Sequence, residues 1–285
     1  MPVITGCPRS GTSLLAVMLD SHSRVAMPPE TAFLTQLGQL AGGGDALRQS
    51  FFELVTCDRA RVSNWSDLGL DKAALAARLD AVRPFAVGDG LRALYALYAE
   101  RFGKARWGEK TPTTNIIQVA AVLPEAHFLH IVRDPRATVP SLRKTWFGGA
   151  QDIDAIARTW VQRVAAGRAA ARAVPHFHEL RYEDLVGDPA AVLRPVCAFL
   201  SLGFEPGMLD YQAQGAARIA SLRARVGADG EVVATREERA GIHANLVRPP
   251  LAERVRSWES ELTADEVRRI EAIAGPLMRE LGYEN

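Results

Sequence analysis

Cysteine is scarce in this chain: only Cys7, Cys57 and Cys197 occur, and they lie far apart. Such spacing provides neither a disulfide framework nor a Cys-x-x-Cys metal pair, and it fits a reducing compartment. An excess of charge of one sign is also missing, since 34 basic residues face 33 acidic ones. This balance argues against binding to nucleic acid or to a membrane through overall charge, although a local basic pocket is compatible with it.

Targeting and membrane segments are absent as well. No window approaches the roughly 18–20 consecutive apolar residues that a membrane-spanning helix requires. The first dozen residues contain no basic stretch followed by an apolar run and a cleavage site, so we expect no secretory signal peptide and a cytoplasmic protein. With 48% hydrophobic and 24% charged residues, the 285-residue chain has an ordinary globular composition, which excludes disordered and fibrous classes.

Apolar patterns predict strands that alternate with helices. Short apolar runs at Val3–Thr5, His127–Val132 and Phe177–Leu180 have the length of buried strands. The almost uniformly apolar stretch Thr12–Leu19 predicts a helix packed into a core, and the capping box that begins at Thr263 predicts a helix near the end of the chain. Strands and helices in alternation indicate the α/β class, with a central, mostly parallel sheet of about five strands and helices on both faces.

The segments between these elements are less clear. Val25–Met27 predicts a second short strand, Glu30 begins a predicted helix, and Trp107–Pro112 has the composition of a loop. From Ser201 to about Asn245 no firm period is visible.

The segment Gly6–Ser13 has the spacing of a phosphate-binding loop, and it lies between a predicted strand and a predicted helix. Glycine lets the backbone curl, so that successive N–H groups converge on a phosphate at the helix N-terminus. The lysine of nucleoside triphosphatases is missing, because Thr12 follows Gly11 and the positive charge comes from Arg9. The loop therefore predicts a different anion, held by backbone amides and by Arg9, Ser10, Thr12 and Ser13; the alternative is a plain strand-to-helix turn.

Gly6–Leu15 resembles the 5′-phosphosulfate loop of the sulfotransferases that use 3′-phosphoadenylyl sulfate (PAPS), and its continuation to Glu30-Thr31 is most similar to the tyrosylprotein sulfotransferase branch. Ile131–Ser141 is similar to the 3′-phosphate signature of this family. Further shared blocks are Arg181–Leu185 with the following Asp188-Pro189, and the tail around Trp258 and residues 281–283. The resemblance implies transfer of a sulfuryl group from PAPS, with 3′,5′-adenosine bisphosphate (PAP) as the product and no metal.

The resemblance also implies roles for single residues. Glu30 would be the general base, Lys110 would contact the leaving phosphate, and Arg9 would stabilise charge on the 5′-phosphate and the sulfuryl oxygens. From the sequence alone, Glu30 is equally a glutamate favoured at a helix N-terminus, and Lys110 a solvated surface lysine. The residues expected to bind the donor are Arg9, Ser10, Gly11, Thr12, Ser13, Arg133, Ser141, Tyr182, Arg236 and Arg239.

The acceptor is not identified by the sequence. It is expected to be a hydroxyl or an amine of a small molecule, a sugar or a peptide, and residues 1–285 are expected to form one domain with a variable acceptor-side insert at about 41–105. A homodimer stays open. Two alternative functions also stay open: a P-loop kinase of a small molecule, which would use ATP and magnesium, and a protein that binds the nucleotide without turning it over.

Overall fold

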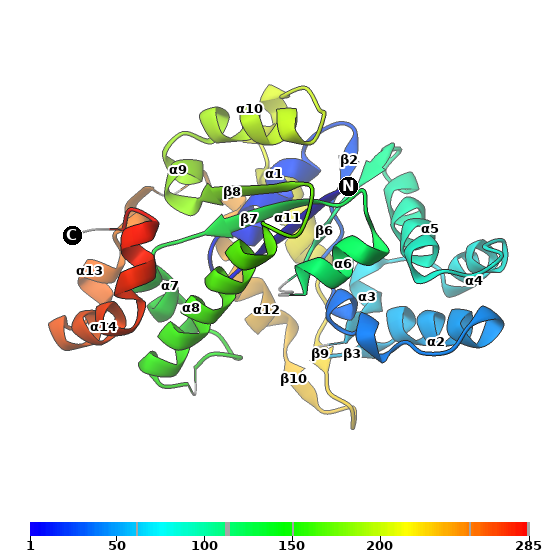
Figure 1. Ribbon diagram of the computed structural model, residues 1–285, viewed down its shortest axis with the longest axis horizontal. Coiled ribbons are helices and arrows are strands. Elements are labelled where there is room, and N and C mark those ends of the chain that lie inside the picture. The colour runs from blue at the N-terminus through cyan, green and yellow to red at the C-terminus, as the bar shows by residue number, and fades with distance from the viewer. Residues whose placement is uncertain (61, 112–114, 150, 251, 284–285) are drawn as a thin grey trace.

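A four-stranded parallel sheet forms the centre of this computed structural model, which describes residues 1–60, 62–111, 115–149, 151–250 and 252–283 (Figure 1). From edge to edge its strands are β6 (Glu109–Lys110), β1 (Pro2–Gly6), β7 (His127–Val132) and β8 (Phe177–Arg181). Because β1 lies between two strands that come later in the chain, the sheet has a switch point there, and open α/β sheets bind ligands at such points. The loop that follows β1 is therefore well placed for a site.

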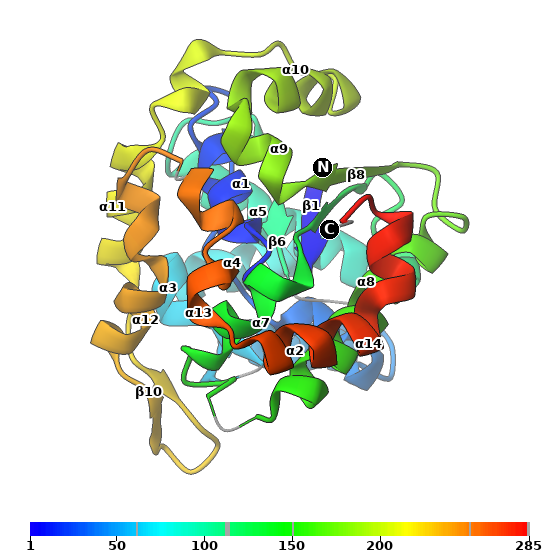
Figure 2. The same ribbon diagram turned by 90° about the vertical axis from the view of Figure 1, so that its left-hand side faces the viewer.

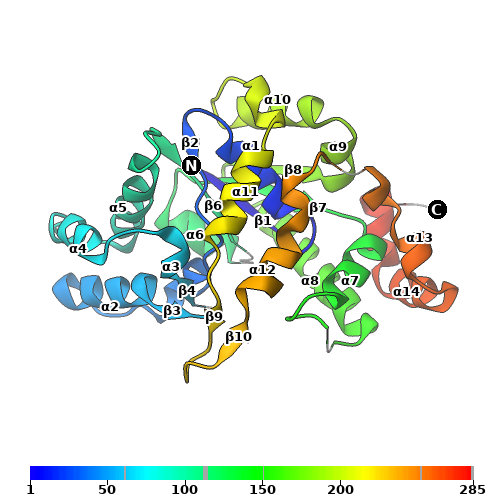
Figure 3. The same ribbon diagram turned by 180° about the vertical axis from the view of Figure 1, so that it is seen from behind.

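Helices cover both faces of the sheet (Figures 1 and 3). On one face, Ile4, Leu129 and Ile131 pack with α1 (Thr12–Asp20), α9 (Tyr182–Gly187) and α10 (Pro189–Phe199). On the other face, Val132 packs with α8 (Ile153–Ala170) and α14 (Ala264–Glu280). Side chains alternate along a strand, so the neighbours Ile131 and Val132 contact opposite layers. The predicted α/β class, with helices on both faces of a parallel sheet, is confirmed.

The other elements surround this centre. A helical region beyond β6 contains α2 (Gly44–Thr56), α3 (Trp65–Leu68), α4 (Lys72–Asp80) and α5 (Val87–Glu100) (Figure 1). The helix α6 (Ile116–Val122) connects β6 to β7 and contacts α8. Short strands pair in three places: β2 (Val25–Ala26) with β5 (Arg106–Trp107), β3 (Asp58–Arg59) with β4 (Ser63–Asn64), and β9 (Arg225–Val226) with β10 (Val232–Ala234). The later part of the chain adds α7 (Pro135–Arg143), α11 (Gln212–Ser221), α12 (Arg236–His243) and α13 (Trp258–Glu261). In the described ranges, no helix has the length and apolarity that crossing a membrane requires.

The C-terminal capping box is present as predicted. The hydroxyl of Thr263 accepts a hydrogen bond from the backbone N–H of Glu266 at 3.2 Å, and the Glu266 carboxylate accepts one from the Thr263 N–H at 2.9 Å. The helix that begins there, α14, lies against α7 and α8 (Figure 2). The reciprocal bonds satisfy backbone donors at the start of the helix, which is why the pattern is informative in the sequence alone.

The number and pairing of the strands differ from the prediction. The central sheet has four strands rather than about five, because the predicted strand at Val25–Met27 pairs with β5 in a separate two-stranded sheet. The segment Trp107–Pro112, expected to be a loop, supplies the edge strand β6 of the central sheet, although Pro112 lies outside the described residues. A strand of two residues is too short to show a period, and its pairing of Glu109 with Val3 is a tertiary contact.

Two further expectations are corrected. Glu30 does not begin a helix: residues 27–32 have no regular structure, and two 3₁₀ turns follow at Phe33–Thr35 and Leu37–Gln39. The backbone carbonyl groups of this segment accept hydrogen bonds from side chains of distant residues instead. The stretch from Ser201 to Asn245, which shows no firm period, contains α11, α12, β9 and β10. Their burial is incomplete, so their apolar periodicity is weak.

Gly11 allows a close approach between the loop after β1 and the helix α9. It precedes α1 with a φ of 96°, and a Cβ atom there would lie 2.4 Å from the ring of Tyr182. Both features disfavour any side chain, since left-handed backbone strains L-residues and the ring blocks the space.

We therefore expect Gly11→Ala to lower the free energy of unfolding by about 2 to 4 kcal/mol. The control is Gly241→Ala in α12, where nothing lies within 4 Å of the added Cβ. This change should be neutral or stabilising by up to about 1 kcal/mol, because alanine favours helix more than glycine does. Denaturant unfolding of both variants provides the comparison. Equal stability of Gly11→Ala and the wild type would contradict the proposed contact.

Candidate functional site

The loop after β1 presents the start of α1 to an open space. The first hydrogen bond of this helix runs from the N–H of Leu15 to the carbonyl oxygen of Gly11 at 3.0 Å, so the preceding N–H groups have no partner inside the helix. Arg9 within the loop has a φ of 70°, a conformation that non-glycine residues seldom adopt. A curled loop that leads into a helix N-terminus is a typical binding place for an anion.

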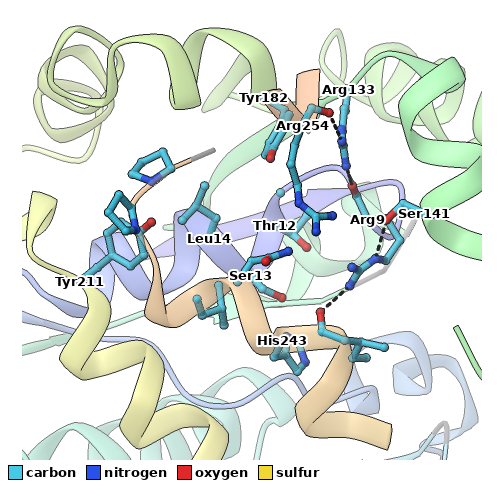
Figure 4. Close-up of a pocket in the computed structure, with 16 residues that line it drawn as sticks. Arg9, Thr12, Ser13, Leu14, Arg133, Ser141, Tyr182, Tyr211, His243 and Arg254 are labelled. Carbon is cyan, nitrogen blue, oxygen red and sulfur yellow. Dashed lines mark hydrogen bonds between the residues drawn. The ribbon is translucent and has the colours of Figure 1, made fainter. Parts of the chain in front are cut away.

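Three arginines from distant parts of the chain surround a small cavity of about 100 Å³ at this loop (Figure 4). Arg133 follows β7, and it donates hydrogen bonds to the carbonyl oxygens of Arg9 at 3.1 Å and of Arg254 at 2.8 Å. Its guanidinium lies 4.4 Å from the ring centre of Tyr182. Arg9 donates to the hydroxyl of Ser141 at 3.1 Å. These contacts connect the loop after β1, the end of β7 and the segment before α13.

The three guanidiniums of this cavity lie close enough to affect one another electrostatically. Burial lowers the pKa of Arg9 to about 10, and the positive charges of Arg133 and Arg254 add to this effect. Burial also lowers the pKa of Arg133. Among the described residues, no carboxylate forms an ion pair with Arg9, Arg133 or Arg254. Three clustered cations that form no ion pair with a described residue favour a multiply charged anion, and guanidinium binds phosphate well.

A second, larger cavity of about 420 Å³ adjoins the first and shares Arg9, Ser13 and His243 with it. Lys110 reaches it from β6, forms an ion pair with Glu30, and donates a hydrogen bond to the hydroxyl of Ser13 at 3.2 Å. The ammonium group that the loop lacks after Gly11 is thus supplied by the neighbouring strand. Arg9 also donates to the carbonyl oxygen of Ile242, at 2.9 Å, next to His243.

The ionisation of the larger cavity depends on this pair. Burial opposes the charged form of Glu30, but the positive charges of Lys110 and Arg225 overcome it and lower the pKa of the carboxyl group to about 2. Burial lowers the pKa of His243 to about 3, and the nearby Lys110 adds to the shift. At neutral pH the cavity is therefore lined by an ionised Glu30 and by an uncharged His243 imidazole.

Tertiary hydrogen bonds hold the irregular segment that carries Glu30. Asn64 donates its side-chain amide to the carbonyl oxygen of Glu30 at 3.3 Å, and Arg218 donates to that of Pro28 at 2.6 Å. The hydroxyl of Thr31 donates to the fully buried carboxyl group of Glu109 at 3.2 Å. Glu109 directly precedes Lys110, so this bond joins the two segments that supply the ion pair.

The structure brings most of the predicted residues together. Glu30, Lys110, Arg9, Thr12 and Ser13 line the larger cavity, and the smaller one is lined in part by Arg9, Gly11, Thr12, Ser13, Arg133, Ser141 and Tyr182.

Three predicted residues lie elsewhere. The Ser10 hydroxyl is buried away from both cavities, and Arg236 is exposed on α12 and lines neither. Arg239 lines the larger cavity rather than the phosphate cavity, because its guanidinium is paired with Asp67 at 2.6 Å.

Among the described residues, five basic ones that line the two cavities are missing from the prediction: Arg218, Arg225, His243, Arg254 and Arg163. The first three lie in the stretch without a clear period, and Arg254 lies shortly after it. No motif marks these four, and only the concentration of arginine in this part of the chain gives a signal.

These features define a class: an α/β protein with a phosphate-binding loop, a cluster of arginines for a multiply charged anion, and an adjoining cavity with a lysine–carboxylate pair. A family model described as "Sulfotransferase family" matches residues 3–206, which is more than half of the chain. The chain belongs to this family and is a sulfotransferase.

Known proteins agree with this assignment. Protein-tyrosine sulfotransferase 1 of Danio rerio is 26% identical over 296 residues, which cover 100% of this chain and 73% of that protein. Among solved structures, the sulfotransferase domain from the curacin biosynthetic pathway superposes with a TM-score of 0.59 at 22% identity, over 95% of this chain and 96% of that one. A mouse sulfotransferase complexed with PAP has a TM-score of 0.53 at 13% identity, over 98% and 84% of the two chains. These two structures are similar in fold.

The buried carboxyl group of Glu109 yields a prediction for stability. Burial raises its pKa to about 8, from the 4.5 that is usual for a glutamate in water. Between these two pH values the folded state keeps a proton that the unfolded state releases, so this contribution to stability is complete below the lower value and is lost as pH rises through the upper one. We expect Glu109→Gln, which cannot ionise, to gain stability relative to the wild type from pH 5 to pH 8, by at most about 1.4 kcal/mol per pH unit.

Denaturant unfolding at several pH values measures this difference. The gain of the glutamine variant should level off above about pH 9, where the folded carboxyl group is also ionised. A difference that stays constant from pH 5 to pH 9 would contradict a buried, protonated Glu109.

Proposed function

We propose that the protein transfers a sulfuryl group from PAPS to a hydroxyl or an amine of its acceptor. The observation that carries this proposal is the pair of adjoining cavities: unpaired arginines surround one, and Glu30 and Lys110 lie in the other. Membership of the sulfotransferase family supports the sulfuryl group, and the PAP complex of the mouse sulfotransferase supports the nucleotide. PAPS carries one phosphate on the 3′ position of its ribose and another on the 5′ position, and cations in both adjoining cavities are available to bind them.

The donor would be held by its phosphates. Arg133, Ser141 and Arg254 are suited to the 3′-phosphate, because they meet in the smaller cavity. Thr12, Ser13 and the N–H groups at the start of α1 are suited to the 5′-phosphosulfate, with Arg9 between the two groups. A forked guanidinium with no counter-charge binds phosphate through paired, charge-assisted hydrogen bonds. The residues thus provide charge neutralisation for the leaving nucleotide.

Glu30 gains basicity when its cation moves away. In the present arrangement Lys110 neutralises the carboxylate and keeps its pKa at about 2. If Lys110 turns toward the oxygen that bridges phosphorus and sulfur, Glu30 loses its main counter-charge while burial, which raises its pKa, remains. The same lysine would then stabilise the leaving oxygen and release the base.

The reaction balances as an in-line displacement. The acceptor oxygen or nitrogen forms a bond to sulfur while the bond between sulfur and the bridging oxygen breaks, the acceptor proton passes to a carboxylate oxygen of Glu30, and PAP leaves. Positioning and charge stabilisation account for most of the catalysis in the related phosphoryl transfer. Lys110, Arg9 and the helix N-terminus contribute the positive charge on the leaving side.

Removing the base or the lysine should strongly reduce turnover. With labelled PAPS and a panel of phenols, alcohols and amines, we expect Glu30→Gln and Lys110→Ala each to lower kcat by about 100-fold to 10,000-fold. Glu237→Gln, on the exposed surface of α12, is the matched charge control and should retain wild-type activity. Full activity in both site variants, or phosphoryl transfer from ATP in place of sulfuryl transfer from PAPS, would overturn the proposal.

The 3′-phosphate should account for the selectivity of Arg133. We expect Arg133→Gln to weaken binding of PAP by about tenfold to 100-fold, and binding of AMP, which lacks the 3′-phosphate, by less than about threefold. Calorimetry with both nucleotides measures the two effects, with Arg172→Gln on the exposed surface as the control. Equal losses for the two nucleotides would mean that Arg133 does not contact the 3′-phosphate.

A further inference from the structure

The larger cavity is strongly basic, yet most of its cations have a partner. Glu30 is the only acidic residue among the described residues that line it, and the basic ones apart from His243 are Arg9, Lys110, Arg163, Arg218, Arg225 and Arg239. Lys110 is paired with Glu30, Arg218 with Asp20 at 3.2 Å, and Arg239 with Asp67 at 2.6 Å. Arg9 belongs to the phosphate loop. Arg163 also has a partner of its own. These contacts leave Arg225 to be explained.

Arg225 is a partly buried cation without a counter-ion. No carboxylate lies within 4 Å of its guanidinium among the described residues, and its buried Nε has no hydrogen-bond partner there. Burial lowers its pKa, while the negative charge of Glu30 raises it. An unpaired guanidinium in a desolvated position is costly unless an anion binds to it. Because Arg225 lines the larger cavity, a ligand bound in that cavity would supply the anion.

The backbone on both sides of Arg225 is fixed. Arg223 donates its N–H to Asp67 at 2.8 Å, and the carbonyl oxygen of Val226 accepts from the N–H of Ala60 at 2.7 Å. The hairpin of β9 and β10 projects next to α12 (Figure 3). Two anchored neighbours fix the backbone from which the Arg225 side chain extends, so that a ligand has to order only the side chain, which reduces the entropy lost on binding.

We propose that the acceptor is a small, largely apolar molecule with one anionic group, such as a carboxylate, which binds Arg225 while the hydroxyl or amine lies at Glu30. This inference rests on the proposed sulfuryl transfer. The volume of about 420 Å³ suits a small molecule, and Trp146, Phe147 and Leu222 provide apolar walls. Arg225 thus selects the charge of the acceptor, and the apolar walls bind its body.

A different role for Arg225 must be distinguished from this one. Its positive charge also favours the ionised form of Glu30, so it can affect every acceptor through the base. Loss of that effect would change the turnover of anionic and neutral acceptors alike. An anion site, in contrast, affects the binding of anionic acceptors only, so a pair of probes that differ only in charge separates the two roles.

The probes are carboxylate and carboxamide forms of three frameworks: 4-hydroxyphenylacetate, 4-aminophenylacetate and 12-hydroxydodecanoate. Calorimetry measures their binding to the protein loaded with PAP, and labelled PAPS measures turnover. We expect the carboxylate of at least one pair to bind about tenfold to 100-fold more tightly than its amide. Arg225→Gln should remove this preference and leave the affinities for the amide and for PAP unchanged. Arg225→Lys should keep part of it.

The control is Arg223→Gln, which removes the same charge from an exposed position two residues away and should retain the preference. Equal binding within every pair, or no binding of any carboxylate, would overturn the inference, and so would an equal loss for carboxylate and amide in Arg225→Gln. Failure of the proposed function has a different signature, because PAP would then not bind or PAPS would not be turned over with any probe. Retained PAP affinity in Arg225→Gln shows that the variant is folded.

Discussion

The ion pair between Lys110 and Glu30 is the interaction on which the rest of the site depends. It joins the edge strand β6 to a segment that has no regular structure, and it supplies the ammonium group that the phosphate loop lacks. The same contact keeps Glu30 ionised despite its burial. One lysine therefore affects both the neutralisation of a phosphate and the basicity of the carboxylate, and a ligand that attracts it changes both at once.

The arginines fall into two groups with different physical roles. Arg136, Arg218 and Arg239 are each paired with a carboxylate and hold segments of the chain together. Arg9, Arg133, Arg254 and Arg225 have no such pair among the described residues. A net charge of only +1 conceals this division, because it counts paired and unpaired cations alike. The ion pairs of each arginine therefore tell more about which arginines can bind an anionic ligand than the net charge of the chain does.

The sequence was sufficient for the parts of the fold and site that local chemistry determines. The strand, loop and helix of residues 2–20 and the capping box at Thr263 follow from short-range patterns. The strand at Glu109–Lys110 and the irregular backbone at Glu30 depend on partners far away in the chain, so no local period marks them. The misplaced Arg236 and Arg239, and the missing Arg225 and Arg254, have the same cause: in an aperiodic stretch, composition does not tell which side chain faces a cavity.

Arg9 connects the two cavities, since it lines both and donates to the carbonyl oxygen next to His243. A nucleotide that attracts the Arg9 guanidinium would release that carbonyl and so reshape a wall that the second reactant meets. Binding of the nucleotide in the smaller cavity would thus change the larger one, so the fold itself favours a fixed order in which the two reactants bind.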